Sequence, residues 1–208
     1  MRNFKEYIDE WKLTDDSVKN IDKTPAFTVK PEYRWDLEDI IVERLKDNVE
    51  CPYLLDIDVS NIDDFHSLFS ADRIYYLWDH GIDGTKIKKV NLSTWNTSKA
   101  TTFFGMFYEC SGLEQVNLSS FNTSRVNEFK SMFYGCSSIK YIDITSFDIR
   151  NGEYFGHMFN GCKSLEKIKG IDKIGINGIP LKYSANTLSM FDFCKESIIP
   201  DWYRKRKN

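Results

Sequence analysis

Hydrophobic residues between positions 86 and 162 recur at a fixed interval of 26 residues. An interval of this length is typical of folds in which short structural units stack on one another. The recurring positions are Trp95, Phe121 and Phe147, the pairs Met106-Phe107, Met132-Phe133 and Met158-Phe159, and Cys110, Cys136 and Cys162. The pattern therefore predicts a repeat protein.

Each copy changes its period halfway. In the middle copy Leu113, Val116 and Leu118 are separated by polar residues, which is typical of a strand with one buried face. The apolar positions that follow lie at 126, 129, 132, 133 and 136, a spacing that favours one stripe of a helix. Ser98 and Ser124 stand where such helices would begin, and a serine hydroxyl can accept from the free amides of a first helical turn. Each unit is thus predicted to contain a strand, a turn and a helix.

The three copies read VNLSTWNTSKATTFFGMFYECSGL, VNLSSFNTSRVNEFKSMFYGCSSI and IDITSFDIRNGEYFGHMFNGCKSL. In their strand motif, their Met-Phe pair and the cysteine turn that follows, they resemble the repeats of the BspA-like leucine-rich-repeat surface proteins of bacteria and some protists. The resemblance implies an α/β fold. It implies a short leucine-rich-repeat solenoid with parallel strands on the concave side, helices on the convex side and an N-terminal helical cap.

One feature departs from the usual leucine-rich repeat, which carries Asn or Cys where this chain has Trp95, Phe121 and Phe147. We expect these rings to form an aromatic spine in place of an asparagine ladder. The backbone of the loops must then find its hydrogen bonds elsewhere, because buried amides and carbonyls are rarely left unpaired.

Residues 1–50 do not repeat and are predicted to form the N-terminal helical cap. A first amphipathic helix is predicted from the apolar residues at 4, 7, 8 and 11. A second is predicted from Asp36 to Asp47, with Leu37, Ile40, Ile41 and Leu45 on its apolar side. This second stretch also resembles the helix that precedes the repeats in BspA-like proteins. An open stack must cover its first apolar face, and a helix laid across that end does so.

The predicted repeat region spans residues 51–194 and contains about five units. Its first unit is degenerate, and the next Met-Phe position follows after 38 residues instead of 26, which places an insertion near residues 70–86. This insertion contains the aromatic run from Ile74 to Trp78, which is either a strand or loop packed on the stack or a protruding recognition element. A second insertion near 170–186 is predicted to be a loop, and residues 195–208 a C-terminal cap and basic tail.

The net charge and hydropathy of the chain limit the classes of partner and the cellular locations that we expect. The net charge of -3 argues against general nucleic-acid affinity, which needs clustered Lys and Arg, and the one basic cluster, at 204–207, is predicted to be a solvated tail. The N-terminus has no apolar leader, and no run approaches the roughly 18 apolar residues of a membrane span. We therefore expect a soluble, cytoplasmic protein, or a surface-exposed one if a leader precedes the given chain.

Cysteine and histidine supply the main alternative. Cys110, Cys136 and Cys162 hold equivalent positions, so we expect a buried column of reduced thiols without metal. Disulfides and a metal site remain alternatives, although no paired CxxC spacing supports zinc. None of the three histidines belongs to a recognisable catalytic set. The alternative hypothesis for the function is nevertheless a Cys/His-dependent enzyme or a metal-binding protein. No cofactor motif is present in the sequence.

The leading hypothesis is a non-enzymatic module that binds one protein partner, as a monomer or weak oligomer. The resemblance implies a role in interaction or adhesion, and the missing leader favours an intracellular target, for instance for a phage or mobile-element product. A mixed-charge face without an aromatic row favours protein over nucleic acid or carbohydrate. The predicted partner-binding residues are Tyr75, Tyr76 and Trp78 in the insertion and Lys89, Asn91, Gln115, Asn117, Tyr141, Asp143, Lys167 and Lys169 at outward strand positions.

Overall fold

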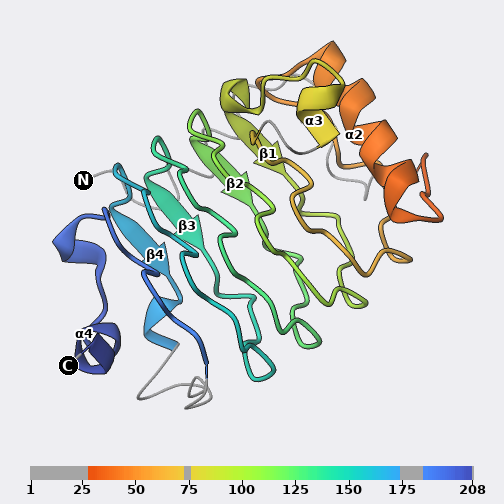
Figure 1. The fold of residues 1–208 in the computed structure, drawn as a ribbon. Coiled ribbons are helices and arrows are strands. Elements are labelled where there is room, and N and C mark those ends of the chain that lie inside the picture. The colour runs from red at the N-terminus through yellow and green to blue at the C-terminus, as the bar shows by residue number, and fades with distance from the viewer. Residues whose placement is uncertain (1–27, 73–75, 174–184, 208) are drawn as a thin grey trace.

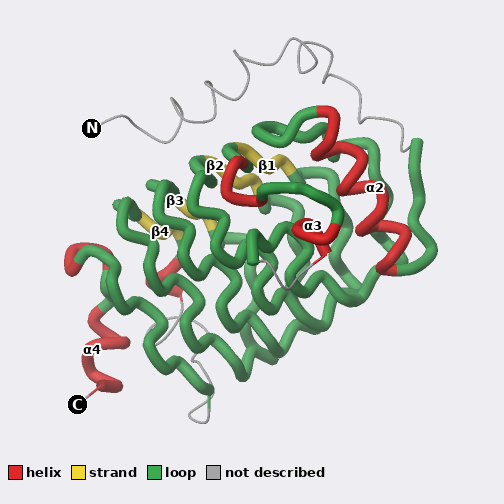
Figure 2. Tube along the Cα trace, turned by 45° about the horizontal axis from the view of Figure 1, so that its top comes forward, coloured by secondary structure: helices red, strands yellow, loops and turns green. Residues whose placement is uncertain are grey.

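The structure, a computed structural model, describes residues 28–72, 76–173 and 185–207. These residues wind into a row of coils, with the strands side by side along one edge and a helix at each end of the row (Figures 1 and 2). In chain order the elements are α2 (Arg34–Asp47), α3 (Tyr76–Asp79), η2 (Gly84–Lys86), β1 (Lys89–Asn91), β2 (Gln115–Asn117), β3 (Tyr141–Asp143), β4 (Lys167–Lys169), η3 (Ile171–Lys173), η4 (Glu196–Ile198) and α4 (Asp201–Lys207).

The strands pair in parallel with the register of the sequence repeat. Lys89 lies opposite Gln115 in the β1–β2 pair, and Tyr141 lies opposite Lys167 in the β3–β4 pair. Instead of one continuous sheet, the described residues form two sheets of two strands each. Each strand is only three residues long. β1, β2 and β3 are short because an Asx turn begins at their last residue, as the side chain of Asn91 shows by accepting from the Ser93 amide at 3.1 Å.

The helices predicted on the convex side are wrong. Residues 126–136 contain no helix: residues 130–135 form turns, and parallel bridges such as Thr102 to Glu128 and Glu128 to Tyr154 join the backbone to the neighbouring coils. Nine residues in two sets of equivalent positions have φ between 52° and 77°: Ser67, Gly105, Ser131, His157 and Ser189 in the first set, and Glu109, Gly135, Gly161 and Phe193 in the second. An α-helix needs φ near -63° at every residue, so these left-handed positions interrupt it.

Because those helices are absent, the predicted helix-capping role of Ser98 and Ser124 is also wrong. Asn96 Oδ1 accepts from the Ser98 amide at 3.1 Å, and Asn122 Oδ1 accepts from the Ser124 amide at the same distance. Each serine therefore closes an Asx turn, and a coil rather than a helix follows it.

The core is organised around a column of stacked phenylalanine rings. Phe69, Phe107, Phe133, Phe159 and Phe191 follow one another with ring centroids 5.3, 5.5, 5.8 and 5.5 Å apart. All five side chains are fully or almost fully buried. The spine predicted from the other aromatic column is only partly formed, because Phe121 stacks on Phe147 at 6.4 Å whereas Trp95 contacts Phe65 and Phe69.

Hydroxyl side chains supply backbone hydrogen bonds that phenylalanine cannot, in addition to the one that Trp95 Nε1 donates to the Leu54 carbonyl at 3.0 Å. Thr97 Oγ1 donates to the Asn122 carbonyl at 3.1 Å and accepts from the Asn122 amide at 2.9 Å. Thr123 repeats both contacts with Asp148 in the next coil, at 2.8 and 2.7 Å. The buried loop backbone is thus paired by a threonine ladder, placed two residues after the aromatic ring.

The predicted burial of Cys110, Cys136 and Cys162 is confirmed, since all three are 0 % exposed and free of disulfides. Each thiol donates to the carbonyl of a phenylalanine in the preceding coil, at 2.9 Å from Cys110 to Phe69 and 3.1 Å from Cys136 to Phe107. Burial raises the pKa of the Cys136 and Cys162 thiols well above the ordinary value. These thiols therefore stay protonated, and the reactive thiolate is scarce.

We expect a thiol reagent to label Cys51 of the native protein first and Cys194 more slowly, because burial raises the pKa of the Cys194 thiol to about 11, and to leave Cys110, Cys136 and Cys162 largely unreacted until the chain unfolds. Cys51 and Cys194 are only partly buried, whereas the other three are closed off inside the coils. Mass spectrometry after timed labelling measures the order of reaction, with the urea-unfolded protein as control. Rapid native labelling of all three buried cysteines would contradict the column.

The helix predicted from Asp36 to Asp47 is present as α2 and begins two residues earlier, at Arg34. Its buried face consists of Leu37, Ile41, Val42 and Leu45, whereas Ile40 is only partly buried. Arg44 fixes the helix to the first coil through an ion pair with Asp56 at 3.0 Å. The helix predicted around residues 4–11 and the loop around 174–184 lie outside the described residues.

The C-terminal end is covered by α4. Trp202 and Tyr203 are buried, and both rings meet the ring of Phe191 edge-on. The Tyr203 hydroxyl also accepts from the Met190 amide at 3.1 Å. The basic cluster at 204–207 continues α4 instead of forming a tail, while Arg204 and Lys205 are exposed to solvent as predicted, and Arg204 pairs with Glu196 at 2.7 Å.

Candidate functional site

The strand edge places the predicted outward residues in rows. The parallel register sets Lys89 beside Gln115 and Tyr141 beside Lys167. Of the eight predicted strand residues, Lys167 is exposed and the other seven are partly buried. Among the described residues no donor reaches the buried Oε1 of Gln115. A buried acceptor without a partner is costly, so this part of the edge would gain from a donor supplied by a partner.

Three of these strand residues serve the scaffold. Asn91 and Asn117 each accept from the amide two residues ahead at 3.1 Å. Asp143 accepts from the Thr145 amide at 2.9 Å and pairs with Lys169 at 2.9 Å. Burial works to raise the pKa of Asp143, but the Thr145 hydrogen bonds and the Lys169 ammonium outweigh it, so the pKa lies below its ordinary value. Lys89, Gln115 and Lys167 are the strand residues with most freedom to contact a partner.

Tyr141 is the one aromatic residue among the predicted strand positions. Burial, followed by the nearby Asp143 carboxylate, raises the pKa of its phenol above the ordinary value. The hydroxyl therefore stays neutral, and the ring offers an apolar contact beside Lys167.

In the described part of the insertion, residues 76–79 form a helical turn, α3, rather than a strand. Leu77 is 2 % exposed and anchors α3 in the core, while Trp78 is 46 % exposed. The Tyr76 hydroxyl donates to the Asp39 carboxylate of α2, and this hydrogen bond, with some burial, raises the pKa of Tyr76 to about 12. Figure 1 shows α3 beside α2, at the N-terminal end of the row. Tyr75 lies outside the described residues.

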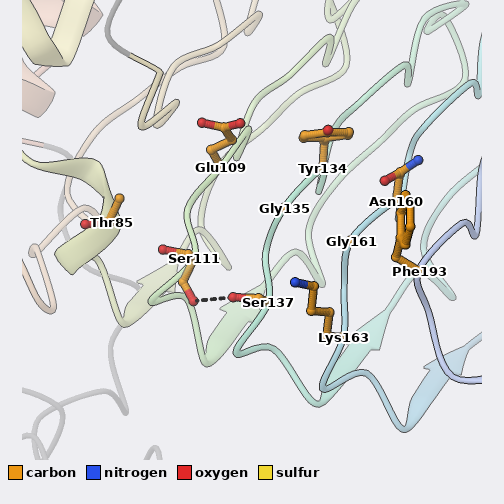
Figure 3. Close-up of a pocket in the computed structure, with 10 residues that line it drawn as sticks. All are labelled: Thr85, Glu109, Ser111, Tyr134, Gly135, Ser137, Asn160, Gly161, Lys163 and Phe193. Carbon is orange, nitrogen blue, oxygen red and sulfur yellow. Dashed lines mark hydrogen bonds between the residues drawn. The ribbon is translucent and has the colours of Figure 1, made fainter.

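The structure contains a groove that the sequence pattern does not predict. It has a volume of about 450 Å³ and crosses several coils. In Figure 3, Glu109 and Tyr134 lie along one side, and Ser111, Ser137 and Lys163 along the other. Its lining residues are Thr85, Glu109, Ser111, Tyr134, Gly135, Ser137, Asn160, Gly161, Lys163 and Phe193. The sequence contains one feature that could have indicated this groove. Glu109 is replaced by glycine at the equivalent positions of the next two repeats, and these residues, Gly135 and Gly161, are the left-handed glycines of the groove floor.

The histidines make local contacts. His66 Nδ1 lies 2.9 Å from Asp64, His80 Nδ1 lies 2.9 Å from the Tyr76 carbonyl, and His157 Nδ1 lies 3.4 Å from Asn160. Within residues 28–72, 76–173 and 185–207, no three His, Cys, Asp or Glu side chains are grouped so as to hold a metal ion. In the same ranges no helix has the length and apolar character to cross a membrane.

These coils define a class of protein, one in which 26-residue units stack in register through parallel bridges. Residues 78–195, which are 118 of the 208, match the family described as "Mycoplasma protein of unknown function, DUF285". The chain belongs to this family. The match begins in α3 and ends just after the last repeat cysteine, so it includes β1 to β4 and every residue of the groove lining. No curated protein and no solved structure matches the chain.

Proposed function

We propose that this chain is a non-enzymatic protein-binding module of the BspA-like leucine-rich-repeat class, built as a short solenoid. The observation that carries the proposal is the register of the coils, which lines up side chains of successive repeats on a scaffold already held by internal hydrogen bonds. Such a surface is pre-organised, and therefore loses little conformational entropy when a partner binds. Parallel-stacked repeats commonly use surfaces of this kind.

The partner we propose is a protein that contacts the strand edge and α3. The edge presents Lys89 and Lys167 with Gln115 and Tyr141 among them, a polar surface with one aromatic ring. Nucleic acid would need a denser basic surface, and single-stranded nucleic acid a row of rings for stacking. Trp78 adds an exposed aromatic side chain at the N-terminal end of the row. Buried aromatic side chains are the usual anchors of protein interfaces.

The test begins with a pull-down from the native host, followed by binding measurements on the captured protein. Trp78→Ala and Tyr141→Ala should each weaken binding about thirtyfold, because truncating a true anchor costs about 2 kcal/mol. Lys130→Ala is the control, since Lys130 is exposed, its ammonium lies over the Phe104 ring, and the residue belongs to neither the strands nor α3. Folding of each variant is checked by circular dichroism.

Two results would contradict the proposal. One is wild-type affinity in both variants while both remain folded, which would remove the strand edge and α3 from the interface. The other is substrate turnover by the purified chain that is lost when His157 or Cys136 is replaced, which would favour an enzyme.

A further inference from the structure

The groove runs across the coils, so a linear ligand in it meets the same position of each repeat in turn. Glu109, Gly135, Gly161 and Phe193 are equivalent residues along it. The two central positions are glycines, which add no side chain to the groove and at which a Cβ would meet the preceding coil at 3.3 to 3.4 Å. The two outer positions carry a carboxylate and a phenyl ring, which stand at opposite ends.

Phe193 has an unfavourable conformation for its residue type. Its φ is 62°, in the left-handed region where residues with a Cβ are strained, and its side chain is 76 % exposed. The fold gains little from the burial of such a ring, and glycine occupies the equivalent position in the two preceding coils. Strain that stability does not explain is commonly found at ligand-binding sites. We therefore assign the Phe193 ring to ligand contact.

The two charged groups of the groove have no ion-pair partner within the described part of the chain. Glu109 and Lys163 are both exposed, and neither makes a salt bridge there. They come from coils two repeats apart, which offsets them along the row by roughly 10 Å at about 4.8 Å per coil, and they stand on opposite sides of the groove (Figure 3). Three residues of extended peptide span the same distance at about 3.3 Å each. Phe193 lies one coil beyond Lys163.

The groove floor cannot accept an added β-strand. The amides of Glu109, Gly135 and Gly161 already donate to the carbonyls of the next coil, at 2.7, 2.8 and 2.9 Å. A ligand must therefore be recognised through side chains. An uncharged glycan would leave both charged groups unpaired, and one face of the Tyr134 ring is already stacked on Tyr108 at 4.7 Å. A peptide carrying both charges can satisfy the two groups at once.

We propose that the groove binds an extended peptide segment of a partner protein through a defined pattern of side chains. A basic side chain pairs with Glu109, an acidic side chain three residues away pairs with Lys163, and an apolar side chain one or two residues further contacts Phe193. The inference rests on the proposed function and assigns the type of segment that a partner presents.

The test selects random ten-residue displayed peptides on the full chain, and the best one is synthesised and titrated by fluorescence anisotropy at low salt. We expect selected peptides to carry the basic, acidic and apolar pattern. Lys163→Glu should weaken binding at least tenfold, while Lys130→Glu, the same charge change outside the groove, should not. The double variant Glu109→Lys with Lys163→Glu should prefer the charge-swapped peptide at least tenfold.

Phe193→Gly separates a binding role from a structural one. It should weaken peptide binding about tenfold and also raise the melting temperature, because glycine relieves the left-handed strain. A lower melting temperature would show that the ring is structural and overturn its assignment. Selection of no peptides, of peptides without the pattern, or of peptides that bind Lys163→Glu as well as wild type would overturn the proposal. The proposal would also be overturned if the protein bound uncharged glycans and Phe193→Gly abolished that binding.

Failure of the groove inference can be distinguished experimentally from failure of the proposed function. Suppose that the groove variants bind every peptide as the wild type does, while binding of the captured partner still depends on Trp78 and Tyr141. Only the groove inference then fails. If peptides bind the groove as described and the host supplies no partner for the strand edge, the strand-edge proposal fails and the groove stands.

Discussion

Replacing Phe133 by alanine is expected to lower the free energy of unfolding by about 3 to 5 kcal/mol. The ring is 0 % exposed and lies between Phe107 and Phe159, at 5.5 and 5.8 Å. Alanine removes the buried ring, leaves a cavity and breaks both stacking contacts, each of which contributes roughly 0.5 to 1.5 kcal/mol. Since domains are typically stable by only about 5 to 15 kcal/mol, the variant should be close to unfolding at physiological temperature.

Urea unfolding followed by circular dichroism measures this loss. Phe193→Ala is the matched control, because it makes the same substitution at a ring that is 76 % exposed. The control should change the free energy of unfolding by less than about 0.5 kcal/mol. A loss below about 1 kcal/mol for Phe133→Ala would show that the phenylalanine column does not support the stack.

A chain that lacks residues 1–50 should fail to unfold cooperatively or should aggregate. Without α2, the first coil exposes the apolar surface that Leu37, Ile41, Val42 and Leu45 cover. Exposing about 400 Å² of apolar surface costs roughly 10 kcal/mol at 25 cal/mol per Å², before the entropy recovered by losing the cap. That cost is comparable to the whole stability of a domain.

Point variants of α2 control for the size of the deletion. Ile41→Ala should cost about 2 to 5 kcal/mol because Ile41 is 0 % exposed, whereas Glu43→Ala on the exposed side should cost less than about 0.5 kcal/mol. Thermal denaturation and analytical ultracentrifugation measure both stability and association. A shortened chain that stays monomeric with an unchanged melting temperature would contradict the capping role of α2.

Two residues that line the groove have a strained backbone conformation, which lowers the stability of the fold. The left-handed positions of the second set are glycine in the two central coils and Glu109 and Phe193 in the outer ones. Glycine adopts this conformation at no steric cost, whereas a residue with a Cβ is disfavoured by about 1 to 2 kcal/mol. The two side chains that we place in the binding groove thus occupy positions where glycine would stabilise the fold.

Much of the interior followed from the repeat interval alone. An interval of 26 residues requires that equivalent residues point in one direction in successive coils, so the cysteine column and the neighbouring phenylalanine column could be predicted as buried. Helix α2 was also predictable, because its apolar residues recur at helical spacing over three turns and it directly precedes the repeats. Both patterns depend on the order of residues along the chain and on no contact between distant parts.

The path of the chain between those columns was decided by the tertiary structure. A stripe at 126, 129, 132, 133 and 136 points inward equally well from a helix or from a coil of turns, so apolar spacing does not distinguish them. The coil forms because each turn shares backbone hydrogen bonds with its neighbours, as between the Phe103 amide and the Glu128 carbonyl at 2.9 Å, and left-handed residues such as Ser131 turn the chain. The groove has the same origin, since its walls come from residues more than 20 positions apart that only the stacking of coils brings together.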